Sequence, residues 1–197
     1  MISSKQDLLD YLEQDKKALG INRRFPRPII DRIWKYEILM RKVAYLYNCK
    51  QGLFNRVLYN IYRLRYEALG MKLGFSIGVN AFGPGLNIAH YGTIVVNGNA
   101  RIGKNCWIYP GVNIGANTEG PEDVPTIGND VYIGPGAKLF GKIVIGDNIS
   151  IGANAVVTKS FMDSGVTIAG VPAKVISNKN SNEIVMRQRI GDDLFLG

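Results

Sequence analysis

The sequence predicts a mainly β fold, in which a triangular solenoid follows an α-helical N-terminal segment. The first observation is a six-residue repeat of aliphatic residues that fills most of the C-terminal part of the chain. The second is a change of periodicity near residue 75, before which apolar residues follow helical spacing. The third is one polar interruption of the repeat. A period of six fits neither a helix nor an ordinary strand, and it is typical of a solenoid.

The helical spacing upstream predicts three helices within residues 1–74. Apolar residues 8–12 form a short stripe that ends near Gly20. A second stripe begins after Pro28, a residue that suits the first position of a helix, and continues to Leu46. A third runs from Leu53 to Leu64 and ends near Gly70.

The repeat itself predicts a solenoid domain over residues 75–176. Its aliphatic positions are Val96, Ile102, Ile108 and Ile114, followed after the interruption by Ile127, Ile133, Leu139, Ile145, Ile151 and Val157. A looser start in a second register contains Ile77, Phe82, Ile88 and Ile94. Each hexad supplies a short strand and a turn, and three hexads complete a coil, so about four coils are expected. Glycine follows the aliphatic residue at six positions, where we expect a small residue to permit a tight corner.

The interruption between Ile114 and Ile127 reads GANTEGPEDVPT and is too polar to pack inside the solenoid. We therefore expect residues 116–126 to protrude as a loop, and long loops on rigid scaffolds often carry function. The remaining residues, 177–197, form a C-terminal tail whose helical pattern is weak.

Composition and charge exclude several classes of protein. Hydrophobic residues make up 46% of the 197, yet no apolar stretch is long enough for a signal peptide or a membrane span. Two distant cysteines, Cys49 and Cys106, suggest free thiols in a reducing cytoplasm. The net charge of +8 lies in residues 1–75, which predicts either a solvated helical face or peripheral contact with an anionic membrane surface. The sequence shows no nucleic-acid-binding motif.

The chain contains one histidine, His90, in the segment GLNIAHYGTIVVN. It stands six and twelve residues before Val96 and Ile102, and therefore in the register of the inward aliphatics. A single histidine is commonly a satisfied structural residue. An imidazole is also the side chain best suited to act as a general base near neutral pH.

Three segments carry a family resemblance: GLNIAHYGTIVVNGNARIG, IGPGAKLFGKIVIGDNISIGANAVV and AGVPAKVI. Residues from about 75 to 176 resemble the serine acetyltransferase branch of the hexapeptide-repeat acyltransferases. The short helical N-terminus is similar to that of members associated with capsule and O-antigen synthesis. The resemblance implies a left-handed parallel β-helix, a homotrimer, and acetyl-CoA bound as co-substrate between adjacent subunits without a metal. It also implies that His90 is the catalytic base of a direct acetyl transfer to a hydroxyl group.

The same resemblance extends to cofactor positions. Gly134, Pro135 and Ala153 match positions that line the pantetheine arm, and Ala116 is a further match. Lys159 and Lys174 are candidates for the phosphates of acetyl-CoA, although either could be an ordinary solvated lysine.

The chain departs from the family where a serine acceptor would be recognised. Two family aspartates correspond to Ala89 and Phe75, and an Arg-His pair in the loop corresponds to Asp123 and Val124. Because an ammonium group calls for a carboxylate and a carboxylate for a cation, these changes favour a neutral acceptor. We therefore expect a sugar or glycan hydroxyl as the acceptor in surface-polysaccharide synthesis.

Polar residues near the histidine are the candidates for holding that acceptor: Asn87, Tyr91, Asn97, Tyr109, Asn113, Glu119 and Asp123. An acid of the loop, Glu119, Glu122 or Asp123, could also orient His90, and a neighbouring subunit could supply it. One alternative is transfer to L-serine by other binding residues. Another is a non-catalytic trimeric scaffold.

Overall fold

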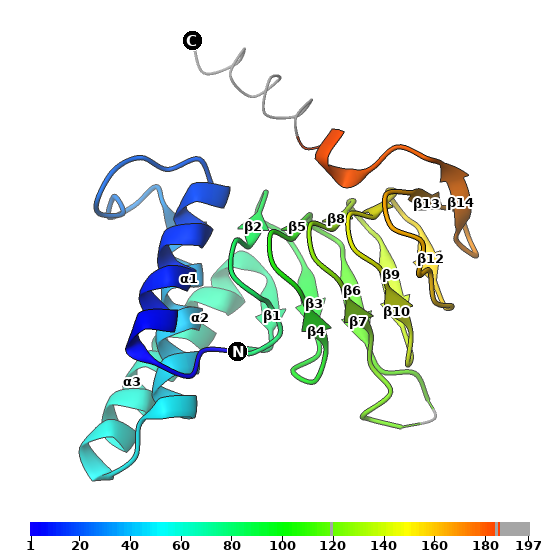
Figure 1. The fold of residues 1–197 in the computed structure, drawn as a ribbon. Coiled ribbons are helices and arrows are strands. Elements are labelled where there is room, and N and C mark those ends of the chain that lie inside the picture. Colours follow the sequence, from blue (N-terminus) through cyan, green and yellow to red (C-terminus); the bar gives the residue numbers. More distant parts are fainter. Residues whose placement is uncertain (119, 184, 186–197) are drawn as a thin grey trace.

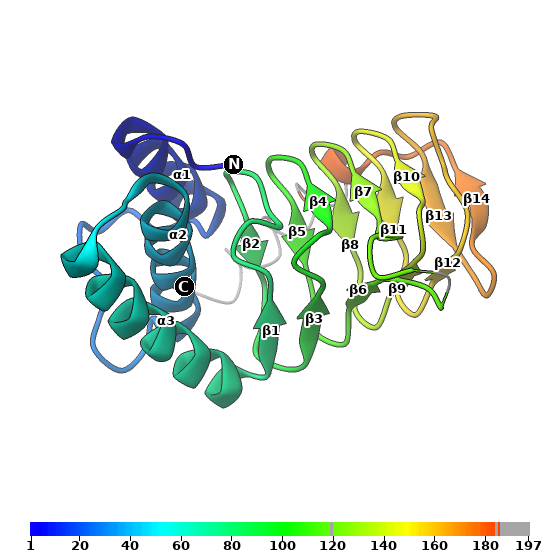
Figure 2. The ribbon, with the colours of Figure 1, turned by 90° about the horizontal axis from the view of Figure 1, so that it is seen from below.

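The computed structural model describes residues 1–118, 120–183 and 185. A helical part lies at one end of a stack of coils, with the N-terminus beside the first coil (Figure 1). The helices are α1 (Lys5–Ala18), α2 (Arg32–Cys49) and α3 (Leu53–Leu73). Helix α2 lies between α1 and α3 (Figure 2). No helix in the described part of the chain is both long and apolar enough to cross a bilayer.

The second helix begins later than Pro28, where the sequence predicted its start. Residues 28–30 form a turn, and α2 starts at Arg32. The reason is Asp31, whose carboxylate accepts hydrogen bonds from the backbone N–H of Arg27 and from the side chains of Arg23 and Arg27. These bonds fix the residues before the helix in a compact turn, which leaves Ile29 74% exposed instead of in the apolar stripe.

Short strands form three parallel sheets along the stack. The first contains β1 (Phe75–Ile77), β3 (Ile94–Val96), β6 (Asn113–Gly115), β9 (Lys138–Phe140) and β12 (Val156–Val157). The second contains β4 (Arg101–Ile102), β7 (Thr126–Ile127) and β10 (Val144–Ile145). The third contains β2 (Asn87–Ile88), β5 (Trp107–Ile108), β8 (Tyr132–Ile133), β11 (Ser150–Ile151), β13 (Thr167–Ala169) and the antiparallel β14 (Lys174–Ser177). We call them the first, second and third sheets.

The core confirms the predicted repeat. Ile108 pairs with Ile133, which lies in register with Ile151, and all three are fully buried. The residue two positions before each repeat aliphatic also points inward, as Val131 does before Ile133. The described residues make five coils, because the looser start from β1 to β2 forms a complete first coil. The regular hexads alone suggested about four.

The glycines after the aliphatic residues act differently from our expectation. Gly103 and Gly134 do not have positive φ angles, so conformational freedom is not their purpose. A Cβ added at Gly103 would lie 2.6 Å from the carbonyl oxygen of Gly128, and one at Gly134 would lie 2.8 Å from that of Ile151. Glycine is therefore required because adjacent coils approach each other closely. Left-handed φ angles occur at other positions: at Asn105, Asp130, Asn148 and Asn154, side-chain types that tolerate positive φ, and at other glycines such as Gly111 and Gly136.

A buried polar cluster joins the helices to the first coil. Asp15 of α1 and Arg41 of α2 form an ion pair, and both side chains are almost fully buried. Asp15 accepts hydrogen bonds from the backbone N–H groups of Gly85 and Leu86, while Arg41 donates to two carbonyl oxygens of the same coil. These backbone groups have no preceding coil to pair with. The helical segment therefore caps the open end of the solenoid.

Candidate active site

His90 lies at the corner between β2 of the third sheet and β3 of the first sheet, and its side chain is exposed. The expectation that it shares the inward register is wrong. Ile88 and Val96 both point inward although eight residues separate them, whereas Ile108 and Ile114 are separated by the regular six. Two additional residues at this corner therefore move the imidazole out of the core and into solvent.

Aromatic side chains extend from the histidine along the stack. The ring of His90 meets the ring of Tyr109 edge to face, with centroids 5.9 Å apart. Tyr109 in turn contacts the ring of Tyr132 on the next coil at 5.3 Å. The contact with Tyr109 restricts the imidazole on one side, and the His90 side chain remains exposed.

The corners that follow His90 form one continuous edge, which we call the corner row: residues 89–93, 109–112, 134–137 and 152–155. Adjacent corners approach closely, since a Cβ at Gly111 would lie 3.0 Å from the Cα of Gly136. Backbone bonds tie them together, as Gly136 N–H donates to Pro110 O at 2.9 Å. Small residues make this edge narrow, so an extended ligand can lie against the backbone there.

The structure brings three of the four small cofactor candidates together with His90. Gly134, Pro135 and Ala153 all lie in the corner row, and the last two are exposed. Tyr91, 56% exposed, and Tyr109 lie in the same row. These predicted cofactor and acceptor residues therefore share one edge of the solenoid, and His90 lies at the end of that edge nearest the helices.

The other candidates lie elsewhere. Ala116 and Asp123 belong to the loop of residues 116–125, which follows the strands of the first sheet, whereas His90 precedes them. Asn97 also lies at the end of these strands away from His90. The Asn97 side chain accepts from the backbone N–H of Asn99, and Asn99 donates to the Glu122 carboxylate at 3.1 Å. Glu119 lies outside the described residues.

Four further candidates lie outside the corner row. Asn87 is buried and its amide donates to Ala18 O at 2.7 Å, so it joins the helices to the first coil. The Lys159 ammonium lies 5.4 Å from the centre of the Phe161 ring on the last coil, and Lys174 is exposed on β14. Asn113 is half-buried at the start of β6, next to the corner row.

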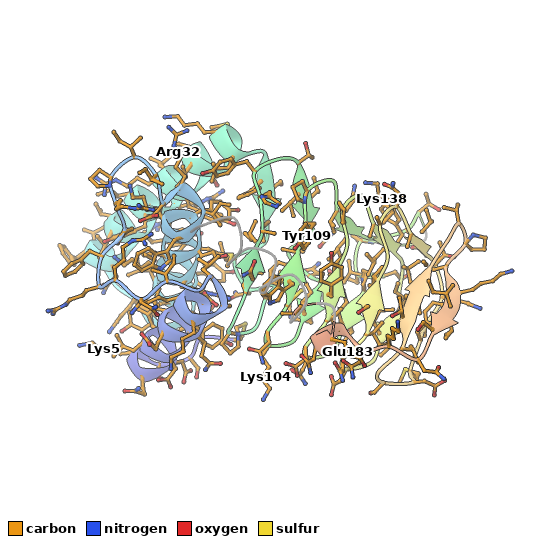
Figure 3. The ribbon with its side chains drawn as sticks, turned by 90° about the horizontal axis from the view of Figure 1, so that it is seen from above. Lys5, Arg32, Lys104, Tyr109, Lys138 and Glu183 are labelled. Atoms are coloured by element: carbon orange, nitrogen blue, oxygen red, sulfur yellow. The ribbon has the colours of Figure 1, made fainter. Side chains whose placement is uncertain are left out.

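Sequence reasoning missed Lys138. Its ammonium donates to the carbonyl oxygen of Gly111, which holds the side chain against the corner row. Gly111 N–H in turn donates to Thr93 O at 2.6 Å, at the corner of His90. Figure 3 shows Lys138 farther from the helices than Tyr109, along the stack. The repeat gives no signal for it, because the outward residue of a strand can be of any polar type.

Two other chemistries can be assessed from the described residues. Cys106 is buried, and burial raises the pKa of its thiol far above the ordinary value, so it is a core residue and not a thiolate nucleophile. The described part of the chain contains no group of histidine, cysteine and acidic side chains that could hold a metal ion.

Comparison with known proteins identifies the family. Residues 125–159 match the family of bacterial transferase hexapeptide (six repeats). A serine acetyltransferase of Mycobacterium tuberculosis is 33% identical over 181 residues, which cover 89% of this chain and 73% of that protein. The chain belongs to the serine acetyltransferase family. It is thus a hexapeptide-repeat acyltransferase, as its motifs predicted.

Other serine acetyltransferases are also similar to this chain. One from Helicobacter pylori is 37% identical over 133 residues, 66% of this chain and 77% of that protein. One from Synechococcus elongatus is 39% identical, but the match spans only 38% of its length. The crystal structure of serine acetyltransferase from Brucella abortus aligns with a TM-score of 0.70 at 26% identity, covering 90% of this chain and 72% of that one. The left-handed parallel β-helix is therefore confirmed.

These relatives overturn the predicted acceptor. The expectation of a sugar or glycan acceptor in polysaccharide synthesis is wrong, because the matching family members are serine acetyltransferases at up to 39% identity. The same relatives give no support to a special resemblance to capsule- and O-antigen-associated members. The error was to treat the loss of the Arg-His pair at Asp123 and Val124 as the loss of any cation for a carboxylate, although Lys138 on another coil also lies against the corner row.

Proposed function

We propose that this protein is a serine O-acetyltransferase that transfers acetyl from acetyl-CoA to the hydroxyl group of L-serine. The observation that carries the proposal is the exposed His90 at one end of a narrow edge of small residues, in a chain of this family. Acetyl-CoA fits that edge because its pantetheine arm is long and thin. A serine acetyltransferase from Brucella abortus with a TM-score of 0.71 was solved in complex with coenzyme A.

In the proposed mechanism His90 accepts the proton of the serine hydroxyl while its oxygen attacks the thioester carbon. A positioned base of this kind contributes about 10²–10⁴ in rate. The carbon–sulfur bond then breaks, and the imidazolium returns the proton to the departing thiolate. Direct transfer is favoured because the one thiol near this end of the solenoid, Cys106, is buried and protonated. Backbone N–H groups of the corners would stabilise the oxyanion.

Serine requires groups for its carboxylate and its ammonium. Lys138 is the cation held against the corner row, and it would bind either the serine carboxylate or a phosphate of acetyl-CoA. Lys138→Met separates the two roles. A rise in KM for serine alone assigns the carboxylate, and a rise in KM for acetyl-CoA alone assigns the phosphate. No change in either would exclude Lys138 from the site.

We propose that the enzyme is a homotrimer whose sites lie between subunits. His90 precedes β3 and the loop of residues 116–125 follows β6, so they lie at opposite ends of the strands of the first sheet and are separated within one chain. A neighbouring subunit can bring its own loop to His90, and the acid of that loop, Glu122 or Asp123, would then orient the imidazole. The two free thiols suit the cytoplasm, where we place the enzyme.

Mixed trimers test the shared site. We expect homotrimers of His90→Ala, and of the loop double variant Glu122→Gln with Asp123→Asn, each to be nearly inactive. Trimers refolded from equal amounts of both should regain about a quarter of the sites, because half of the subunits supply each intact element. Mixtures that stay as inactive as the parents, although exchange is shown by mass, would place the site within one subunit.

The first assay is thiol release from acetyl-CoA, run on L-serine and on a panel of sugars. We expect saturable turnover with serine, reduced at least a hundredfold by His90→Ala with little change in acetyl-CoA affinity. Turnover with sugars and none with serine would refute the proposal. Activity of the variant within a few-fold of wild type would refute the role of His90.

A further inference from the structure

The outer face of α3 carries apolar side chains that nothing in the described chain covers. Its inner face packs on α2 and β1, and the deeply buried residues there are Tyr66, Gly70 and Leu73. The opposite face is exposed: Phe54 is 78% exposed, Leu64 66% and Met71 79%. Figure 2 shows α3 on the far side of α2 from α1 and leading into β1.

The exposed residues follow a heptad repeat. They are Phe54, Val57, Ile61, Leu64, Ala68 and Met71, spaced alternately by three and four residues. This spacing puts Phe54, Ile61 and Ala68 at the a positions of a coiled coil and the other three at the d positions. We call these six residues the α3 seam. A seam of a and d residues is the pattern by which helices pack side by side with one another.

The charges beside the α3 seam favour a parallel arrangement of identical helices. Glu67 occupies a g position, and Arg65 and Lys72 occupy e positions. In a parallel pair, g of one helix faces e of the next heptad on the other, so Glu67 meets Lys72. In an antiparallel pair the e positions face each other, which would bring the basic residues together. Parallel packing gives cyclic symmetry, the symmetry of a trimer with parallel β-helices.

We propose that the α3 seam is an interface between copies of this chain, where α3 helices pack in parallel about the axis of the trimer. The inference rests on the trimer in the proposed function. A seam of six residues is short, and such a helix associates weakly by itself. In the trimer the β-helices hold the copies together, so the three α3 helices are at a high effective concentration and can pack through the α3 seam.

Disulfide trapping in the full-length protein tests the arrangement. In a parallel coiled coil, identical d residues face one another, so Leu64→Cys should form intermolecular disulfides rapidly under mild oxidation. Arg56→Cys is the control, because it is exposed on the same helix but lies off the α3 seam, whereas Arg63 pairs with Glu67 in its own chain. We expect at least a tenfold faster dimer band on non-reducing gels for Leu64→Cys. Equal rates for the two variants would overturn the proposal.

Charge reversal tests the direction of packing. Glu67→Lys should slow the trapping of Leu64→Cys, and adding Lys72→Glu should restore it, since the pair then re-forms with opposite signs. Failure of the restoration would overturn the parallel arrangement. The basic helices could instead contact an anionic membrane. Binding of wild type to phosphatidylserine vesicles that is lost in Leu64→Glu, without any trapping of Leu64→Cys, would assign the surface to the membrane and refute the interface.

The outcome for the trimer is read separately. Sedimentation of the wild type gives the number of copies, and the thiol-release assay gives the activity. If Leu64→Cys forms the disulfide but the wild type sediments as a dimer, the α3 seam interface is supported and the proposed trimer is refuted. A trimer active on serine but without trapping would refute the α3 seam alone.

Discussion

Removing the carboxylate of Asp15 should strongly destabilise the protein. Asp15 accepts bonds from Arg41 Nε at 2.7 Å and Nη2 at 3.2 Å, and from the N–H groups of Gly85 at 2.8 Å and Leu86 at 3.0 Å. Asp15→Ala leaves the Arg41 charge buried without its counterion, and a broken buried pair costs about 3–5 kcal/mol. That is a large share of the ~5–15 kcal/mol by which domains are stable.

Urea unfolding followed by circular dichroism measures this effect. The control is Glu13→Ala, which removes ion pairs with Lys16 and Lys17 at the surface of α1. An exposed pair contributes at most about 1 kcal/mol, so we expect a small shift of the unfolding midpoint. Equal shifts for the two variants would refute the reasoning from burial.

A double variant separates capping from simple charge pairing. In other proteins a buried ion pair can be exchanged for apolar residues without loss of stability. Here Asp15→Leu with Arg41→Met would leave four backbone groups of residues 82–86 without partners. Each buried orphan costs about 1 kcal/mol or more, so the variant should stay roughly 3 kcal/mol or more below wild type. Full recovery would show that the cluster does not cap the first coil.

Three further predictions concern buried groups. Burial, with the Asp15 charge as a smaller cause, raises the pKa of Glu37 well above its ordinary 4.5, so the folded protein retains a proton that the unfolded chain releases above about pH 4.5. Stability therefore falls as pH rises above that value. Glu37→Gln should raise the free energy of unfolding at pH 7 but not at pH 4, and an equal gain at both would contradict this reasoning. Ile133→Asp should abolish soluble expression by burying a charge between coils, while Val144→Asp on the outer surface should fold; comparable circular dichroism spectra for both would disprove the register. Cys49 should react with a thiol reagent in the native protein and buried Cys106 only after unfolding, and equally fast labelling of both would refute the assignment of Cys106 to the core.

The fold could be predicted because the repeat is determined locally. An inward aliphatic residue recurs every six positions, and each one meets the equivalent residue of the next coil, as Ile108 meets Ile133. The start of α2 could not be predicted from a periodic pattern. It depends on Arg23 and Arg27 reaching Asp31, and side-chain hydrogen bonds of this kind leave no periodic trace in the sequence.

The candidate base was found from its motif, but its position was not. Counting in sixes puts His90 inside the solenoid, because the count assumes that no corner holds additional residues. In the structure Val96 follows Ile88 by eight positions and not six, and the two additional residues expose the imidazole. The proposed base thus lies where the repeat is broken, since a perfect repeat would have buried His90.

The acceptor was misjudged for a related reason. Sequence comparison treats recognition as a property of matched positions, so the replacement of the loop Arg-His pair by Asp123 and Val124 looked decisive. In a β-helix each coil returns to the same corner row, and a residue far along the chain is a neighbour of the base in space. Lys138 is joined to the histidine corner through Gly111 and Thr93, although it follows the loop in sequence. A lost binding group can therefore be replaced from another coil, and the acceptor has to be judged from the whole corner row.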